Sequence, residues 1–260
     1  MCSPCRGARS EGAMKTLLVT GGSRGIGAAT ALKAAAAGWR VAVNYVRHAQ
    51  AAAEVVASIE AAGGEAFAVQ GDMSREEAIL SVFGEIDRRG QGLGGLVNNA
   101  GVVDVKARLD GMDAARLERM MRTNVIGPLL CAREAVRRMS TAHGGQGGVI
   151  VNLSSVAALL GSPGWYVDYA ASKGAIDTFT KGLALEVARE GIRVCGVRPG
   201  IIATDIHASG GQPDRVAETR AGLPMGREGT AGEVAEGIVF LLSDAASYMT
   251  GVTIDISGGR

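Results

Sequence analysis

Short runs of apolar residues alternate with longer helical patterns from Lys15 to the end of the chain. The expected strands are Thr16 to Thr20, Arg40 to Asn44, Ala66 to Gln70, Leu93 to Val97, Gly148 to Leu153, Arg193 to Val197 and Thr253 to Ile256. Most of these runs are almost continuously apolar, as strands are when helices cover both faces of a sheet. The alternation therefore predicts an α/β fold, with a doubly wound parallel sheet of about seven strands between two helical layers.

Residues 14–260 are expected to form a single domain, because no Pro- or Ser-rich linker divides the sheet. Two helices have expected N-caps, each with carboxylates in or near the first turn: Asp113 for a long helix toward Met139, and Ser74 for one toward Arg88. The least regular stretch is 203–232, which is too long for an ordinary connection. We predict that it is a lid-like insertion over the substrate.

The composition narrows the classes of partner. Of the 260 residues, 47% are hydrophobic and 20% charged, which is enough for a large core. The net charge of +1 offers no basic field for nucleic acid or an anionic membrane, and no apolar run is long enough to span a bilayer. Residues 1–13 lack the apolar core of a signal peptide. They are predicted to be a disordered extension of a cytoplasmic protein.

The cysteines indicate no metal site. Cys2 and Cys5 have a suggestive spacing, but no second pair of ligands accompanies them. Cys131 and Cys195 fall in a helical and a strand pattern, where a free thiol is usually a small buried hydrophobe.

A glycine-rich turn follows the first expected strand. The segment Thr20-Gly21-Gly22-Ser23-Arg24-Gly25-Ile26-Gly27 opens an Ala-rich helix. Glycines permit a tight turn and let the backbone approach a pyrophosphate, whose charge is favoured at the helix N-terminus. This strand–turn–helix context predicts a dinucleotide-binding fold of the Rossmann type.

The end of the second expected strand indicates NADP(H) as the preferred cofactor, with NAD(H) as the alternative. The segment Val43-Asn44-Tyr45-Val46-Arg47-His48 contains no carboxylate that would bind a ribose 2′-hydroxyl. Arg24 and Arg47 could both reach a 2′-phosphate. The other interpretation is that both arginines are only solvated.

A hydroxyl, a phenol and a cation are expected to converge at one strand end. Ser155 follows a buried strand, and Tyr169 and Lys173 share one face of the next helix because they lie four positions apart. Alone, such a pair is more often a half-buried Tyr beside a solvated Lys. Hydride transfer between a nicotinamide and a carbonyl, however, needs a proton at the substrate oxygen. Tyr169 is the expected acid/base, because a neighbouring cation lowers the phenol pKa from about 10, and Ser155 can hold the substrate oxygen.

The order of these motifs resembles that of the short-chain dehydrogenase/reductase family. The residues that carry the resemblance are the glycine turn, Asn98-Asn99-Ala100-Gly101, Asn124, Ser155 and Tyr169-x-x-x-Lys173. The resemblance runs from about Lys15 to the C-terminus, and the order and spacing together are specific. It implies an oxidoreductase with Asn124, Ser155, Tyr169 and Lys173 as catalytic residues, Asn124 anchoring a water that links Lys173 to solvent. From the residues alone, Asn124 is as readily a helix irregularity.

The resemblance also implies a set of cofactor contacts, from the phosphate turn through the adenosine end to a Pro-Gly turn that holds the nicotinamide. The implied residues are Gly21, Ser23, Arg24, Ile26 and Gly27, then Tyr45, Arg47, Asp72 and Met73, then Asn99, Ala100 and Gly101, and finally Pro199, Gly200, Ile202 and Thr204, together with Tyr169 and Lys173.

The loop before Tyr169 departs from the family pattern. Ser155 lies 14 positions before Tyr169, about one more than is usual, and Ser154 would make the departure larger. We therefore prefer Ser155 and expect one extra residue in 161–167. Trp165 and Tyr166 either line the substrate pocket or pack at its rim, and His207 in the insertion is more often solvated than a pocket residue.

The predicted function is hydride transfer between NADP(H) and a small carbonyl compound or secondary alcohol. The alternative is a non-catalytic dinucleotide-binding sensor or scaffold. Among enzymes, a 3-oxoacyl thioester reductase and a sugar or polyol dehydrogenase are both left open. An acidic carrier protein would need a basic patch, for which the candidates are Arg116, Arg119, Arg122, Arg133, Arg137 and Arg138. The resemblance implies a homotetramer or dimer, with which the small residues Gly174, Gly182 and Ala184 and the C-terminal residues 255–260 are compatible.

Overall fold

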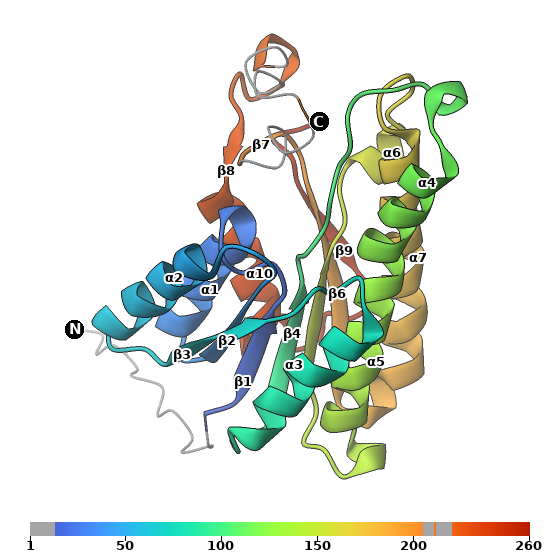
Figure 1. The fold of residues 1–260 in the computed structure, drawn as a ribbon. Coiled ribbons are helices and arrows are strands. Elements are labelled where there is room, and N and C mark those ends of the chain that lie inside the picture. The colour runs from blue at the N-terminus through green and yellow to red at the C-terminus, as the bar shows by residue number, and fades with distance from the viewer. Residues whose placement is uncertain (1–13, 205–210, 212–219) are drawn as a thin grey trace, which may run out of the picture.

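The computed structural model describes residues 14–204, 211 and 220–260, and it confirms the doubly wound α/β fold (Figure 1). Seven parallel strands form one sheet in the order β3-β2-β1-β4-β5-β6-β9. All seven expected strands are present, with ends shifted by at most two residues. Their bounds are β1 Thr16–Val19, β2 Arg40–Tyr45, β3 Ala66–Gln70, β4 Leu93–Asn98, β5 Gly148–Leu153, β6 Ile192–Pro199 and β9 Thr253–Ile256.

Helices cover both faces of this sheet (Figure 1). One face carries α1 (Gly25–Ala36), α2 (Ala49–Ala61) and α10 (Ala231–Leu242), and the other carries α3 (Glu76–Arg88), α5 (Gly127–Met139) and α7 (Val167–Val187). The shorter elements are α4 (Ala114–Met121), α6 (Ala157–Leu160), a π-helical turn η2 (Arg122–Ile126), and the 3₁₀ turns η1 (Leu109–Gly111), η3 (Thr141–His143), η4 (Ala188–Glu190), η5 (Arg220–Gly222) and η6 (Asp244–Ala246).

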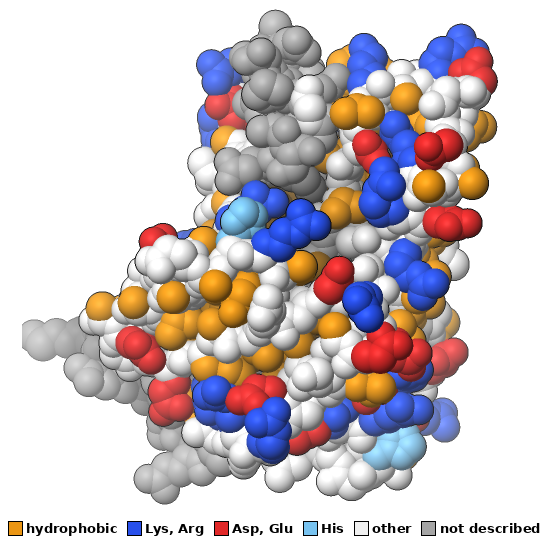
Figure 2. Space-filling view, viewed as in Figure 1, with side chains coloured by type: hydrophobic (Ala, Val, Ile, Leu, Met, Phe, Trp, Pro, Cys, Tyr) orange, Lys and Arg blue, Asp and Glu red, His pale blue; other side chains and the backbone are white. Residues whose placement is uncertain are grey.

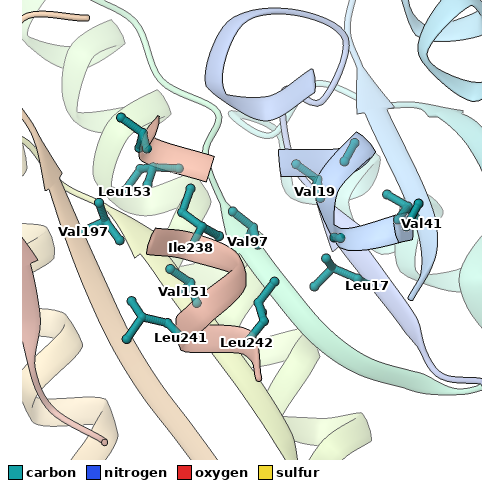
Figure 3. Packing of buried hydrophobic residues seen from close by; sticks show 14 of the residues in the cluster. Leu17, Val19, Val41, Val97, Val151, Leu153, Val197, Ile238, Leu241 and Leu242 are labelled. Atoms are coloured by element: carbon teal, nitrogen blue, oxygen red, sulfur yellow. The ribbon is translucent and has the colours of Figure 1, made fainter. Parts of the chain in front are cut away.

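Alternate residues of one strand enter opposite hydrophobic cores, because side chains leave a strand toward its two faces in turn. In β1, Leu17 and Val19 belong to the core beneath α1, α2 and α10 (Figure 3), whereas Leu18 belongs to the core beneath α3, α5 and α7. All three are fully buried. The strands therefore read as continuous apolar runs because neither face of the sheet meets water.

The strand order reverses between β1 and β4. From β1 the chain continues outward through β2 to β3, and it then crosses back through α3 to β4 on the other side of β1. In an open parallel sheet, the connections at the carboxyl ends diverge at such a point and leave a crevice that binds ligands. The glycine turn after β1 and the segment after β4 therefore meet at one place.

The two expected N-caps have different outcomes. Asp113 caps α4, since its Oδ1 accepts a 2.8 Å hydrogen bond from the backbone N–H of Arg116. The prediction for Ser74 is wrong. The backbone N–H and the hydroxyl of Ser74 both donate to Asp72 Oδ1, at 2.9 and 2.7 Å, and α3 begins only at Glu76. The local turn around Asp72 uses the hydroxyl that would otherwise cap the helix.

The long helix expected from Asp113 to Met139 is interrupted by the π-helical turn that contains Asn124. In this turn the N–H of Gly127 bonds to the carbonyl of Arg122, five residues earlier. Pro128 has no N–H, so the α-helical bond from position 128 to the carbonyl of Asn124 does not form. The helix irregularity beside Gly127 thus has a covalent cause, which is the missing N–H of Pro128. Such π-helical turns are frequent at functional sites.

Two short strands that the sequence pattern did not predict lie at the start of, and within, the stretch predicted to be a lid. β7 (Ile202–Ala203) pairs in parallel with β8 (Gly229–Thr230). Thr230 and Glu233 then form a capping box at the start of α10. His207 and nearly half of the predicted lid, residues 205–210 and 212–219, lie outside the described residues.

No helix in the described ranges combines the length and apolar character needed to cross a bilayer. The cytoplasmic location stays a prediction.

Candidate active site

A groove crosses the carboxyl ends of the central strands. Its two halves share the lining residues Ile26, Asn99, Gly101, Val103 and Thr204. One half lies over the glycine turn and the ends of β2 and β3, and the other contains the three predicted reacting groups: Ser155, Tyr169 and Lys173. Because the halves are continuous, an elongated ligand can place one end in each.

Two side-chain amides hold the glycine turn. Asn99 Nδ2 donates to the carbonyls of Thr20 and Gly21 at 2.8 and 3.0 Å. Asn44 Oδ1 accepts from the N–H of Gly21 at 3.1 Å, while its Nδ2 donates to the carbonyl of Gly71 at 3.0 Å. Sequence reasoning found Asn99 but gave Asn44 no role. A polar residue inside the apolar run of β2 was the signal that could have found it.

The glycine turn fits a pyrophosphate. Gly21 and Gly25 have φ values of +61° and +54°, which favour glycine. The N-cap of α1 is Arg24, whose side chain makes no capping hydrogen bond, so the first N–H groups of the helix suit an anion. Gly27 has another role from the one implied: a Cβ there would lie 2.3 Å from the carbonyl oxygen of Gly21, so this glycine permits close packing and does not line the groove.

The half of the groove over the glycine turn is basic at the end that lies away from the reacting groups. Arg24, Arg47, His48 and Arg119 line it, and Figure 2 shows Lys, Arg and His colours gathered near the N-terminal ends of α1 and α2. Other predicted cofactor residues in this half are Gly21, Ser23, Ile26, Tyr45, Asp72, Asn99, Ala100 and Gly101. The Met73 side chain is buried in the core instead, and Met73 does not line the groove. Pro199, Gly200, Ile202 and Thr204 line the half with the reacting groups.

Lys173 is a buried cation aimed at the carboxyl end of β5. Its Nζ donates to the carbonyl of Leu153 at 2.7 Å and lies 5.6 Å from the centroid of the Tyr169 ring. Burial lowers the pKa of Lys173 to about 8, and the charge of Asp177 acts in the opposite direction. The ammonium is therefore close to its titration range at neutral and mildly alkaline pH.

Asn124 connects three parts of the site. Its side chain bonds twice to the backbone of Val102, accepting from the N–H at 2.8 Å and donating to the carbonyl at 2.9 Å. Its Nδ2 also lies 3.2 Å from the hydroxyl of Ser172, which donates to the carbonyl of Tyr169. A Cβ on Gly101 would lie 3.4 Å from Asn124 Oδ1 and 3.6 Å from Lys173 Nζ, so glycine allows these groups to approach.

The two adjacent serines have different environments. Ser154 is buried, and its hydroxyl donates to the carbonyl of Lys173 at 3.1 Å. Ser155 is less buried, and its Oγ accepts from the N–H of Ala157 at 3.1 Å, which leaves its hydroxyl proton for another acceptor. Both line the pocket. The arrangement favours Ser155 as the group that meets a ligand.

The two aromatic residues of the loop also differ. Tyr166 is buried and lines the pocket, whereas Trp165 does not. The Trp165 ring instead lies edge-on to Tyr166, with Lys106 Nζ 3.8 Å from its centroid, and its carbonyl accepts from the N–H of Ala107. Trp165 therefore packs the loop onto the segment after β4.

A buried ion pair, which the sequence did not indicate, fixes the start of α7 beside the site. Arg116 Nε and Nη2 donate to the two carboxylate oxygens of Asp168 at 2.8 and 3.3 Å, and Nη1 donates to the carbonyl of Val105 at 2.7 Å. The side chains are only 8% and 2% exposed. No local pattern could have found this pair, because its members lie 52 residues apart.

Five of the six arginines predicted as a basic patch form ion pairs, and within the described ranges only Arg122 does not. Besides Arg116, Arg119 pairs with Asp104, and three arginines of α5 pair with Glu134, Glu76 or Asp87; these are Arg133, Arg137 and Arg138. The partners neutralise much of the field that an acidic carrier protein would need.

Among the described residues, no group of three or more His, Cys, Asp or Glu side chains could hold a metal ion. The structure thus offers a nucleotide groove beside a pocket with a hydroxyl, a phenol and an ammonium.

Comparisons with known proteins agree with this geometry. A family model described as "Enoyl-(Acyl carrier protein) reductase" matches residues 21–260. The chain is 56% identical over 247 residues to the uncharacterized oxidoreductase YgfF of Escherichia coli, covering 95% of this chain and all of that protein. It is 39% identical to 3beta-hydroxysteroid dehydrogenase 1 of Eggerthella lenta, covering 94% and 93% of the two chains. Among solved structures, a short chain dehydrogenase from Burkholderia cenocepacia in complex with NADP aligns with a TM-score of 0.86 at 33% identity, covering 94% and 97%.

The buried pair between α4 and α7 gives a stability prediction. Arg116→Met should lower the free energy of unfolding by about 3–5 kcal/mol, because it leaves the carboxylate of Asp168 buried without its cation. Arg108→Met is the matched control. Arg108 pairs with Asp110 at side chains that are 79% and 73% exposed, so its loss should cost less than about 1 kcal/mol. Urea denaturation measures both, and equal losses would contradict the prediction.

Proposed function

The chain belongs to the short-chain dehydrogenase/reductase family of oxidoreductases, and from this we propose that it transfers a hydride between NADP(H) and a carbonyl compound or secondary alcohol. One observation carries the proposal: Ser155, Tyr169 and Lys173 line one pocket, which continues into the groove over the glycine turn. A non-catalytic sensor would need the groove but not the three groups.

Each reacting group has a proposed task. The bound nicotinamide supplies or accepts the hydride. In the direction of reduction, Tyr169 donates a proton to the substrate oxygen, and in oxidation it accepts that proton. The Lys173 ammonium favours the phenolate form of Tyr169 by its charge. Ser155 donates a hydrogen bond to the same substrate oxygen and holds it within reach of Tyr169. Asn124 fixes the segment after β4 against α7 and is proposed to anchor a water beside Lys173.

The described lining favours substrates with an apolar body. Besides the reacting groups, the pocket is lined by the apolar residues Val103, Val156, Ala157, Leu160 and Ile201, and by polar residues that include Ser162, Tyr166 and Arg260. A sugar or polyol needs a hydrogen-bond partner for each of several hydroxyls, and the apolar part of the lining supplies none. We therefore propose a ketone or acyl-type carbonyl substrate ahead of a polyol.

Replacing Tyr169 with Phe should separate catalysis from cofactor binding. We expect kcat to fall at least about 100-fold, because the acid/base is lost. The affinity for NADPH should change less than about threefold, since the glycine turn is untouched. Tyr248→Phe, at a fully exposed tyrosine, is the control. Steady-state kinetics and NADPH fluorescence titration measure the two effects, and a fully active Tyr169→Phe enzyme would refute the assignment.

The basic end of the groove predicts a cofactor preference. Wild-type kcat/KM should be higher with NADPH than with NADH. Arg47→Ala should lower the value for NADPH by at least about tenfold, because the charge-assisted contact with the 2′-phosphate is lost. The value for NADH should change little. Equal or better efficiency of the wild type with NADH would overturn this preference.

We also propose a homotetramer or dimer. Gly182 is exposed on α7, and a Cβ at Gly174 or Gly182 would meet nothing within 4 Å, so this helix offers a flat outer surface. Ala184 does not belong to that surface, contrary to expectation, because it is fully buried in the core. Light scattering at micromolar concentration should give two or four times the mass of one chain, and a monomer would count against the proposal.

A further inference from the structure

Four charged side chains form a row from the active site to the edge of the sheet. Lys173 and Asp177 lie one turn apart on α7, Arg198 is on β6 and Asp255 is on β9. Asp177 Oδ2 accepts from Arg198 Nε at 2.8 Å, and Arg198 Nη1 donates to Asp255 Oδ1 at 3.1 Å. Arg198 directly precedes Pro199 and Gly200, which line the pocket. The row therefore joins α7 to the predicted nicotinamide turn.

Asp177 is only partly neutralised by its partner. Its side chain is 16% exposed and that of Arg198 is 18% exposed. Its second oxygen, Oδ1, is buried and has no hydrogen-bond partner among the described residues. The negative charge of such a carboxylate still acts on nearby groups, because water screens charges only weakly in a mostly buried site.

In the part of the chain that the structure describes, few charged groups near Lys173 compete with this field, although the C-terminal Arg260 lines the same pocket. The titratable groups that face it on α7 are Tyr169 and Asp177. From the other elements it meets the carbonyl of Leu153 on β5 and, across Gly101, the neutral amide of Asn124. Arg198 on β6 affects Lys173 through its ion pair with Asp177.

We propose that Asp177 is a positioning residue for the reaction, which keeps the Lys173 side chain charged inside the buried site, and that Arg198 sets how much of the Asp177 charge reaches it. The inference rests on the proposed function, in which reduction needs Lys173 as an ammonium. It assigns a role to a side chain that lines neither half of the groove.

The electrostatic role and a merely structural one predict different results for two variants. Asp177→Asn and Arg198→Met both break the same ion pair, so a structural role moves both in one direction. The charges act in opposite senses. Asp177→Asn removes an anion and makes Lys173 lose its proton at lower pH, whereas Arg198→Met frees the field of Asp177 and makes Lys173 keep its proton to higher pH.

The test is the pH dependence of kcat/KM for carbonyl reduction by NADPH, between about pH 6 and 10. The alkaline limb should move to lower pH by at least about half a unit in Asp177→Asn and to higher pH in Arg198→Met. Asp255→Asn is the matched control, because it removes the same charge beyond Arg198 and should move the limb less. Asp177→Glu should restore the wild-type limb. No movement in Asp177→Asn, or movement of it and Arg198→Met in the same direction, overturns the proposal.

A second readout does not depend on turnover. The chain has five lysines, so the titration of Lys173 can be followed by NMR of protein labelled at the lysine side chains, with Lys173→Met assigning the signal. The same opposite shifts are expected in the two variants. If the wild type transfers no hydride, the proposed function fails, while this titration still decides whether Asp177 and Arg198 control Lys173.

Discussion

Because helices bury both faces of the sheet, a polar side chain that must meet a ligand can leave the strands only at their ends. Backbone polar groups within the sheet are satisfied along its ladder, and most of the side chains between them are apolar. The carboxyl ends of β1, β4, β5 and β6 lie next to one another in the sheet, although they are far apart in the sequence. One architectural constraint therefore gathers the glycine turn, the two serines and the Pro-Gly turn at a single edge.

The same burial governs the electrostatics of that edge. An ammonium taken out of water loses hydration and must regain it from fixed dipoles or counter-charges. Lys173 has a carbonyl at 2.7 Å and a carboxylate one helical turn away, and its pKa still falls to about 8. A site held this close to its titration point is sensitive to small changes in its surroundings. This is why the carboxylate of Asp177, one helical turn away, belongs to its description.

The sequence was sufficient for the strands, the glycine turn and the pocket that holds Ser155, Tyr169 and Lys173, since each rests on a local pattern of apolar residues or a fixed spacing. The sequence was insufficient where a side chain could form a hydrogen bond with either of two nearby groups in the chain. Ser74 bonds to Asp72 and leaves α3 without its expected cap. Side-chain contacts between segments that are far apart in the chain have no recognisable pattern in the sequence. Arg116 meets Asp168, and Asn44 meets Gly21, only because the chain has folded. The catalytic tasks of the individual site residues are proposals, whereas the fold shows where these residues lie.

The π-helical turn around Asn124 separates the rotational phase of α4 from that of α5. A turn with five-residue bonding holds one residue more than an α-helix would need, and one residue is worth about 100° around the helix axis. α5 can therefore direct Ala132, Ala135 and Met139 into the core while α4 directs Arg116 toward α7. In a continuous α-helix, one of these two faces would be turned away from its partner. The π-helical turn thus lets α4 and α5 each face its own partner, which a single continuous helix would not allow. Insertions or deletions within 122–126 should therefore be tolerated less than changes of residue type.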